Sequence, residues 1–373
     1  MARPAVGLIV NPVAGIGGKV GLKGSDGEEI QRKARALGAT PEAGRRASIA
    51  LTRLAPIADR IELVACPAEM GARAAQAAGH LPSLVGSIRS ALTTAEDTKR
   101  AAGEMAQMGV RLLLFAGGDG TARDIYDAVG SAVPALGIPA GVKIHSAAFA
   151  INPAAAGDLA AAFLSGSVSR LREAEVMDLD EEAVRSGRVA PRLYGYLKIP
   201  VERMLTQGSK VASAASEASS MAAIAAAIVD HMEDECIYIL GPGTTTRAIT
   251  DRLELPKTLV GVDAIANRRI AAMDANEAQI LELIQGRRAK IIVTPIGGQG
   301  CVFGRGNQPI SADVIAQVGR QNIIIVSTPQ KIHALENRPL WVDTGNPEMD
   351  KMLSGYVRVV TGYGEEAVVR ISC

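Results

Sequence analysis

Short apolar runs that lead into glycine-rich loops, and then into helix-like segments, recur along the whole sequence. Such junctions lie at residues 5–19, 111–129 and 236–246. An apolar run of about six residues is typical of a buried strand. Strands that alternate with helices form a mostly parallel sheet covered on both faces. The sequence therefore predicts an α/β fold whose N-terminal part is a Rossmann-like parallel sheet.

The chain has 373 residues, which at roughly 150 residues per domain predicts two domains. The pattern changes after Gly141, where charged and alternating segments replace the regular junctions. We expect a nucleotide-binding α/β domain at 1–145. A second, mixed and strand-rich α/β domain with the acceptor-site loops is expected at 146–373, including a helix within 208–232.

Composition excludes several classes of protein. The net charge is +1, from 40 basic and 39 acidic residues, and aromatic residues make up 3%. A nucleic-acid-binding protein would show a basic excess and stacking rings. No apolar run approaches the ~20 residues of a membrane span. The four cysteines form no CxxC pair, which favours neither a zinc site nor a disulfide framework. We expect a cytoplasmic protein with no nucleic-acid or membrane partner.

The glycine loops themselves predict the ligand. In an open α/β sheet, ligands bind beyond the carboxyl ends of the strands, so we expect these loops to converge on one crevice. Glycine lets backbone N–H groups approach an anion, and the following helix offers its positive end. Phosphate is the ligand that fits, although single glycines also serve simply to turn the chain.

Familiar nucleotide motifs do not fit these loops. Gly15 and Gly17 are followed by Val20 where a dinucleotide fingerprint needs a third glycine. Six positions before Lys19, where a Walker loop needs its first glycine, the sequence has Val13. No Gly-x-Ser-x-Gly elbow occurs, so a serine hydrolase is also unsupported. Neither an ordinary dehydrogenase nor a P-loop NTPase is indicated.

The pentapeptide Gly-Gly-Asp-Gly-Thr at 117–121 carries the most chemistry. Asp119 stands between glycines at the end of an apolar strand. For phosphoryl transfer such a carboxylate can orient a substrate hydroxyl and accept its proton, or hold Mg²⁺ on the phosphates. The alternative is a turn aspartate that bonds its own backbone.

Other polar residues have two interpretations each. Lys143 either neutralises phosphate charge or is a solvated surface group, and His145 is either an acid–base group or structural. Arg305, between two glycines, suits bidentate contact with phosphate. Asp263 either serves a ribose or a metal, or is an exposed helix acid.

The pentapeptide at 117–121 after an apolar strand, together with the early strand that ends in Asn-Pro-Val-Ala-Gly at 11–15, resembles the NAD kinase and diacylglycerol kinase superfamily. Four segments in order resemble more closely its bacterial and archaeal branch of ATP-NAD kinase family proteins. They are Asn-Pro-Val-Ala-Gly at 11–15, Gly-Leu-Lys-Gly-Ser-Asp at 21–26, Gly-Pro-Gly-Thr-Thr at 241–245 and Thr-Pro-Ile-Gly-Gly-Gln-Gly at 294–300. This branch includes a protein associated with acetoin catabolism. The resemblance covers nearly the whole chain.

The resemblance implies a kinase that uses ATP and Mg²⁺ to phosphorylate a hydroxyl of NAD, with Asp119 near the transferred phosphoryl group. It also implies a homo-oligomer. The residues that we expect to bind the nucleotides are Asn11, Gly15, Gly117, Gly118, Gly120, Thr121, Gly141, Lys143, Gly243, Thr244, Thr245, Thr294, Gly297, Gly298 and Arg305. Metal ligands are not indicated.

Two departures from the family pattern concern the acceptor. Val142 and Ile144 stand where the superfamily has Thr and Asn, which weakens a lipid-kinase interpretation. Gly298 and Gln299 replace Ser and Thr of the NAD kinase Thr-Pro loop. The alternatives are therefore a kinase of another hydroxylated metabolite or lipid, and an inactive nucleotide-binding regulatory protein of acetoin-type catabolism. ATP and polyphosphate remain open as donors.

Overall fold

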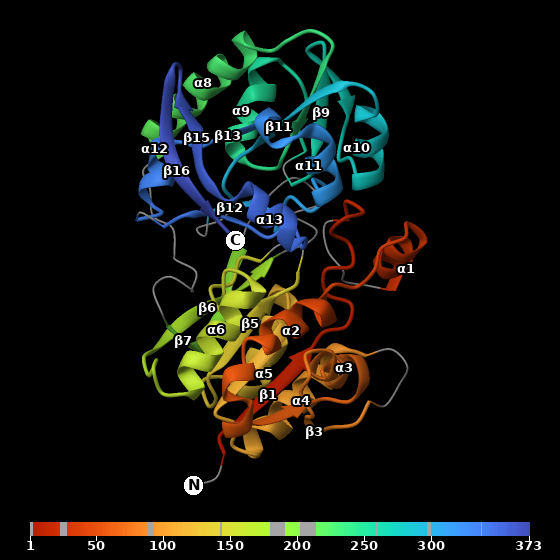
Figure 1. The fold of residues 1–373 in the computed structure, drawn as a ribbon, viewed down its shortest axis with the longest axis vertical. Coiled ribbons are helices and arrows are strands. Elements are labelled where there is room, and N and C mark those ends of the chain that lie inside the picture. Colours follow the sequence, from red (N-terminus) through yellow and green to blue (C-terminus); the bar gives the residue numbers. More distant parts are fainter. Residues whose placement is uncertain are drawn as a thin grey trace. The chain divides into compact units, whose positions relative to one another are not determined.

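The computed structural model describes residues 3–22, 28–88, 93–141, 144–179, 191–201, 214–258, 260–296, 300–336 and 338–373. The chain forms two compact units, shown in Figure 1. The first comprises residues 1–16, 24–35 and 40–207. The second comprises residues 17–23, 36–39 and 208–373.

In the first unit, the described residues form a five-stranded parallel sheet with the order β3-β2-β1-β4-β5. Its strands are β1 Ala5–Val10, β2 Glu62–Ala65, β3 Ser83–Leu84, β4 Leu112–Gly117 and β5 Ala135–Pro139. Every residue of β4 is buried, as expected for a central strand with both faces covered. The predicted Rossmann-like parallel sheet is confirmed.

Helices cover both faces of this sheet. α2 and α6 contact each other and β5, while α4 and α5 contact each other and the opposite face. Ile9 and Phe115 point toward α4 and α5 and join their buried core. The helices are α1 Glu28–Ala36, α2 Ala43–Thr52, α3 Ala72–Ala77, α4 Ala95–Gln107, α5 Asp119–Val129 and α6 Pro153–Leu164, with short 3-10 helices at Ala55–Arg60 and Ala68–Met70.

An antiparallel hairpin of β6 Leu171–Leu179 and β7 Pro191–Pro200 packs against α5 and β5. Ala174, Val176, Leu197 and Ile199 of the hairpin are fully buried in the core of the first unit. Burying each of the larger side chains contributes about 1.5–3 kcal/mol. By these contacts, β6 and β7 pack as part of the first unit.

In the second unit, the described residues form a nine-stranded mixed sheet with the order β10-β9-β8-β11-β13-β15-β16-β14-β12. The strands are β8 Cys236–Leu240, β9 Asp263–Ala266, β10 Arg269–Ala272, β11 Arg288–Val293, β12 Cys301–Phe303, β13 Ile323–Val326, β14 Leu340–Val342, β15 Gly355–Gly362 and β16 Glu365–Ser372. At the centre of this sheet, four successive strands run parallel to one another: β8, β11, β13 and β15. The expected mixed, strand-rich α/β domain is confirmed.

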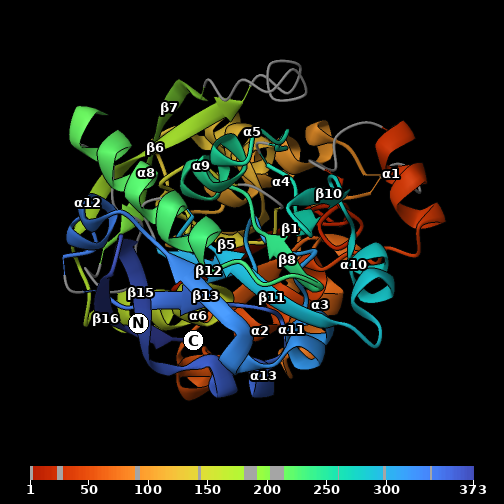
Figure 2. The same cartoon turned by 90° about the horizontal axis from the view of Figure 1, so that it is seen from above.

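Two separate apolar cores lie on the two faces of this sheet. α8 and α9 contact each other and can be found side by side in Figure 2. Their buried residues pack with Tyr238, Leu240 and Val326. Ile280 and Ile315, from helices on the other face, pack with Ile291. The helices are α8 Ala214–Asp230, α9 Thr244–Arg252, α10 Glu277–Ile284, α11 Ala312–Val318, α12 Pro329–His333 and α13 Pro347–Leu353, with a 3-10 turn at Arg320–Asn322.

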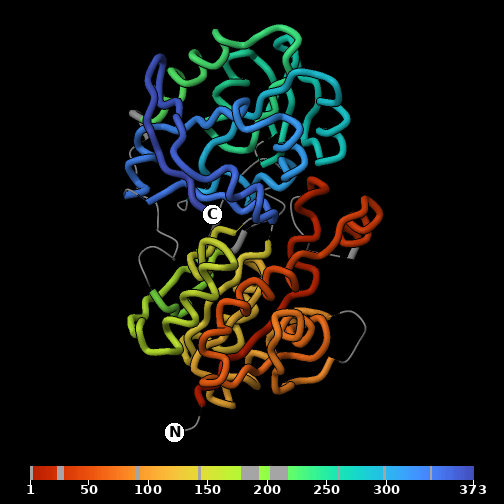
Figure 3. The backbone as a smooth tube through the Cα atoms, viewed as in Figure 1, coloured from red at the N-terminus to blue at the C-terminus, as the bar shows by residue number. Residues whose placement is uncertain are grey.

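The N-terminal segment 17–22, which can be followed in Figure 3, belongs to the second unit. The N–H of Glu277 donates to the carbonyl of Lys19 at 3.2 Å. Gly21 lies against Asn276, which caps α10. Throughout the described ranges, no helix combines the length and apolar character needed to cross a membrane.

Candidate functional site

The pentapeptide at 117–121 spans the end of β4 and the first turn of α5. Gly117 closes the strand, Gly118 precedes the helix and Asp119 is its first residue. The first N–H groups of a helix lack intrahelical partners, and the helix dipole places positive charge there. An anionic group is therefore favoured beside this turn.

Asp119 is buried, with 9% of its side chain exposed. Its Oδ2 accepts the backbone N–H of His145 at 2.8 Å, and its Oδ1 accepts that of Ser146 at 2.9 Å. Ser146 is in turn fully buried, and its hydroxyl accepts the N–H of Met177 in β6. Asp119 thus joins the start of α5 to the segment that follows β5, instead of bonding within its own turn.

Asn11, directly after β1, connects the first glycine loop to the same helix. Its Nδ2 donates to Thr121 Oγ1 at 3.0 Å, and its Oδ1 accepts the N–H of Val13 at 3.2 Å. The backbone N–H of Asn11 also donates to Ala116 in β4. The side chain therefore holds the carboxyl ends of β1 and β4 together.

The loop after β5 completes this arrangement. The N–H groups of Ala140 and Gly141 both donate to the carbonyl of Gly117 at 2.9 Å. Gly141 approaches Gly118 so closely that an added Cβ would stand 2.8 Å from the Gly118 Cα. Within the first unit, three strand ends thus meet around Asp119.

Gly15 offers a direct test of this convergence. Its φ is +81°, and an added Cβ would lie 2.2 Å from the Ala140 carbonyl oxygen. Gly79 has the same φ, and no atom lies within 4 Å of its added Cβ. Gly79→Ala therefore measures only the cost of placing a residue with a side chain at this φ, about 1–2 kcal/mol. We expect Gly15→Ala to lower the free energy of unfolding by about 1–3 kcal/mol more than Gly79→Ala, by overpacking. Urea unfolding measures both; equal losses would contradict the close approach.

In the second unit, the loop after β8 leads into α9. Gly243 precedes the helix at φ +130°, and the hydroxyl of Thr246 donates to the carbonyls of Gly241 and Gly243 at 2.7 and 3.0 Å. Thr245 is fully buried, whereas Thr244 is exposed. The Thr246 hydroxyl therefore fixes the backbone of this loop at the point where α9 begins.

Two residues from other parts of the second unit bring buried polar atoms to this loop. Thr294, after β11, contacts Gly243, and Asn307, after β12, contacts Gly241. Thr294 is 2% exposed, and among the described residues neither its hydroxyl nor Asn307 Oδ1 has a hydrogen-bond partner. A buried polar atom without a partner costs about 1–3 kcal/mol, which makes Thr294 a candidate for bonding a ligand.

Lys331, in the first turn of α12, brings positive charge to the same loop. Its Nζ donates to Thr245 Oγ1 at 2.9 Å and lies 3.9 Å from Glu217 Oε1. Lys331 thus links the strand ends of β8 and β13 within the second unit.

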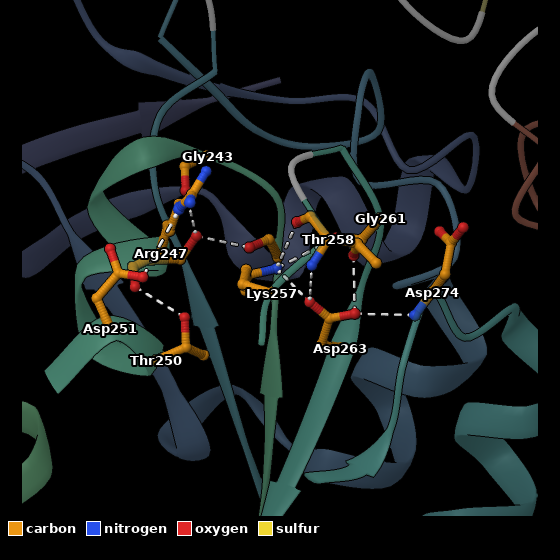
Figure 4. A network of polar contacts seen from close by, with 11 residues as sticks. Gly243, Arg247, Thr250, Asp251, Lys257, Thr258, Gly261, Asp263 and Asp274 are labelled. Atoms are coloured by element: carbon orange, nitrogen blue, oxygen red, sulfur yellow. Dashed lines mark hydrogen bonds and ion pairs between the residues drawn. The ribbon is translucent and has the colours of Figure 1, made fainter. Parts of the chain in front are cut away.

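Beside β8, a polar network is centred on the buried side chains of Lys257 and Asp263 (Figure 4). Asp263 begins β9, opposite Leu240 at the end of β8. Its carboxylate accepts Lys257 Nζ at 2.9 Å, the Thr258 hydroxyl at 2.7 Å and the N–H of Asp274 at 2.8 Å. Burial lowers the pKa of Lys257, although Asp263 opposes that shift. The interpretation of Asp263 as an exposed helix acid is wrong.

The structure brings part of the predicted set together in each unit. Asn11, Gly15, Gly117, Gly118, Thr121 and Gly141 surround Asp119 or contact its neighbours, and Gly120 lies in the same turn. Gly243, Thr245 and Thr294 adjoin one another in the second unit. Arg305 is half-buried between Gly304 and Gly306, both at positive φ. Lys143, Gly297 and Gly298 lie outside the described residues.

Two residues in contact with these loops were absent from the predicted set. His145 lies beside Asp119, and its position directly after the glycine-containing segment 136–143 was the available signal. Lys331 follows Thr328 and Pro329, a helix-start pattern that placed it in a first turn. Nothing in the sequence indicated that Lys331 would reach a glycine loop, whereas His145 was weighed as an acid–base group without a partner being named.

Comparison with protein families agrees with the two-unit division. Residues 6–168 match the family model described as ATP-NAD kinase N-terminal domain. Residues 233–371 match the ATP-NAD kinase C-terminal domain. A search of curated proteins found no match.

Proposed function

This chain belongs to the ATP-NAD kinase family, and from that premise we propose that it transfers the γ-phosphoryl group of ATP to a hydroxyl of NAD. The observation that carries the proposal is the convergence of the ends of β1, β4 and β5 around the buried Asp119. Glycine backbone and a helix N-terminus there suit phosphate oxygens, and we propose that Asp119 lies near the transferred group.

A phosphoryl-transfer site acts mainly by positioning its two substrates and stabilising charge, with little covalent chemistry by the protein. Phosphoryl transfer spreads negative charge over the equatorial oxygens while the attacking and leaving oxygens stay in line. The N–H groups of the first turn of α5 provide donors for that charge, and the Asn11–Thr121 hydrogen bond holds the two loops in place. In the second unit, Thr294 and the loop at 241–246 are proposed to contact the second nucleotide.

We include Mg²⁺ as an ion carried on the phosphates of ATP. Mg²⁺ is held in kinases by one or two carboxylates together with phosphate and water oxygens. The described residues contain no group of three His, Cys, Asp or Glu side chains that would hold a metal. Asp119 Oδ1 accepts one backbone N–H and so retains a lone pair for a cation, whereas Oδ2 also lies 3.4 Å from His145 Nδ1.

The decisive experiment measures NADP formed from NAD and ATP by this protein. NADP formation supports the proposal. Turnover with another hydroxylated metabolite or a diacylglycerol, but not NAD, would assign a different acceptor to the same mechanism. Binding of ATP and NAD by calorimetry without any turnover would favour the regulatory alternative. Polyphosphate in place of ATP tests the donor.

Thr294→Val separates a ligand contact from a structural role. Removing an unpartnered buried hydroxyl is expected to raise the free energy of unfolding by about 1 kcal/mol, yet to weaken nucleotide binding severalfold. Thr250→Val is the matched control, because the Thr250 hydroxyl is buried and donates to Arg247 at 2.8 Å. The control should destabilise the protein and leave affinity unchanged. Unaltered nucleotide affinity in Thr294→Val would remove Thr294 from the proposed site.

A further inference from the structure

Phosphate groups need positive charge beside them, and the described residues gathered around Asp119 supply little of it. Asp119 itself contributes a carboxylate, while Asn11 and Gly141 are neutral. Lys143, the cation predicted for this edge of the sheet, lies outside the described residues. Kinases stabilise phosphoryl groups during transfer with Arg, Lys or Mg²⁺. We therefore expect another element of the first unit to bring a cation to these strand ends.

Helix α2 brings Arg46 to the strand ends. The Arg46 Nη1 donates to the carbonyl of Pro139, the last residue of β5, at 3.0 Å. The next two N–H groups along the chain, those of Ala140 and Gly141, both donate to the carbonyl of Gly117 at the end of β4. The guanidinium is thus bonded to the residue directly before the loop that contacts the end of β4.

The start of α2 lies at the same edge of the sheet. An added Cβ on Gly15, in the loop after β1, would stand 3.8 Å from the Cβ of Glu42, the residue that precedes α2. Ala43 and Ala47 of the helix are fully buried, and α2 contacts β4 and β5, as can be followed in Figure 1. Close packing with such short side chains brings the helix near the sheet. Arg46, next to this buried face, is half-buried and reaches β5.

Arg45, one residue earlier, has a different environment. Its Nε donates to Glu42 Oε2 at 2.8 Å, and 44% of its side chain is exposed. Arg45 therefore pairs with the residue that precedes its own helix, whereas Arg46 is bonded across to the sheet. A guanidinium is permanently charged, and its planar fork can pair two phosphate oxygens at once. Of these two consecutive arginines, Arg46 is the one that holds such a fork at the strand ends.

We propose that Arg46 binds phosphate oxygens of the ATP molecule held by the first unit, and so discriminates the triphosphate from the bare nucleoside. This rests on the kinase function proposed above and adds a binding residue for its phosphoryl donor. The bond to Pro139 orients the guanidinium, and the N–H groups at the start of α5 are the donors for other oxygens of the same phosphates.

A purely structural role of Arg46 predicts a different result. An arginine that only anchored α2 to β5 would act on the shape of the whole nucleotide site. Its loss would then change the affinities for ATP and for adenosine by the same factor, because adenosine has no phosphate. A phosphate contact affects ATP alone.

The test compares the binding of ATP and of adenosine to wild type, Arg46→Gln and the neighbouring control Arg45→Gln. Calorimetry measures ATP, and ligand-observed NMR measures the weaker adenosine. Arg46→Gln is expected to weaken ATP binding about 10- to 100-fold, the size of a charged hydrogen bond, and adenosine binding less than about twofold. Arg45→Gln should bind both ligands as the wild type does. Unchanged ATP affinity in Arg46→Gln, or an equal loss for both ligands, would overturn the role of Arg46.

Arg46→Lys decides the question if Arg46→Gln does not fold. Lysine keeps the charge and a donor for Pro139 but not the planar fork. The expected result is a loss of about three- to tenfold in ATP affinity with adenosine affinity unchanged. Circular dichroism and urea unfolding check that the variant is folded. In that case wild-type ATP affinity, or parallel losses for ATP and adenosine, would count against the phosphate contact.

The two levels fail differently. A wild type that binds ATP but phosphorylates no acceptor overturns the kinase function, and the binding comparison still decides the role of Arg46. A wild type that forms product, with an Arg46→Gln variant that binds ATP equally well, overturns only the role of Arg46.

Discussion

Asp119→Asn is expected to lower kcat for NADP formation by about 10³-fold while the protein remains folded. The substitution removes the negative charge near the transferred group and the partner of His145. General acid–base groups contribute about 10²–10⁴-fold, and the role proposed for Asp119 beside the transferred group belongs in that range. Steady-state assays at saturating ATP and NAD measure the effect.

The structure also predicts a second consequence of this substitution. An asparagine offers one acceptor oxygen, so its amide NH₂ would face one of the two backbone N–H donors at 145 and 146. Thermal stability should therefore fall modestly. Asp158→Asn is the matched control, because Asp158 is an exposed acid of α6 paired with Arg53. An Asp119→Asn variant with wild-type kcat would contradict both the proposed site and the role of the aspartate.

Lys257→Met is expected to lower the free energy of unfolding by about 3–5 kcal/mol. Lys257 and Asp263 are 1% and 0% exposed at their side chains, and the substitution leaves the carboxylate buried without its cation. The ammonium also donates to the carbonyls of Thr258 and Gly261 at 3.3 Å, so the loop after α9 loses its anchor. Urea unfolding, followed by circular dichroism, measures the loss.

The double variant Lys257→Met with Asp263→Asn tests the physical cause. The introduced amide would keep an acceptor oxygen for Thr258 or Asp274 but carry no charge. We expect the double variant to be more stable than Lys257→Met alone by about 1–3 kcal/mol, because an uncompensated buried charge is the larger cost. Lys99→Met, which breaks the exposed pair of Lys99 with Glu96, should have little effect. A Lys257→Met variant as stable as Lys99→Met would show that the buried pair contributes nothing.

Much of the fold was predictable because strand and helix patterns are local. The apolar runs that open the junctions at 5–19, 111–129 and 236–246 form β1, β4 and β8 in the structure. The ordered glycine motifs predicted the family, which both domain matches confirm. These signals are carried by consecutive residues, so they survive without knowledge of the tertiary contacts.

The domain boundary and the surroundings of individual charged residues were harder to predict from the sequence. The sequence placed the start of the second domain at residue 146, yet Val176 of β6 and Leu197 of β7 are buried in the core of the first unit. Asp263 carries no sign of its partner, because the Lys257 ammonium reaches its carboxylate only in the folded chain. Burial and pairing depend on residues brought together from separate elements.

The sequence by itself determined where strands end in glycine and where an aspartate stands among them. Only the tertiary structure decided which of those ends meet, and that both Asp119 oxygens face the backbone at 145–146 with an imidazole alongside. The physical reason is that a glycine loop has many allowed conformations. Contacts from the next strands of the sheet select one of them.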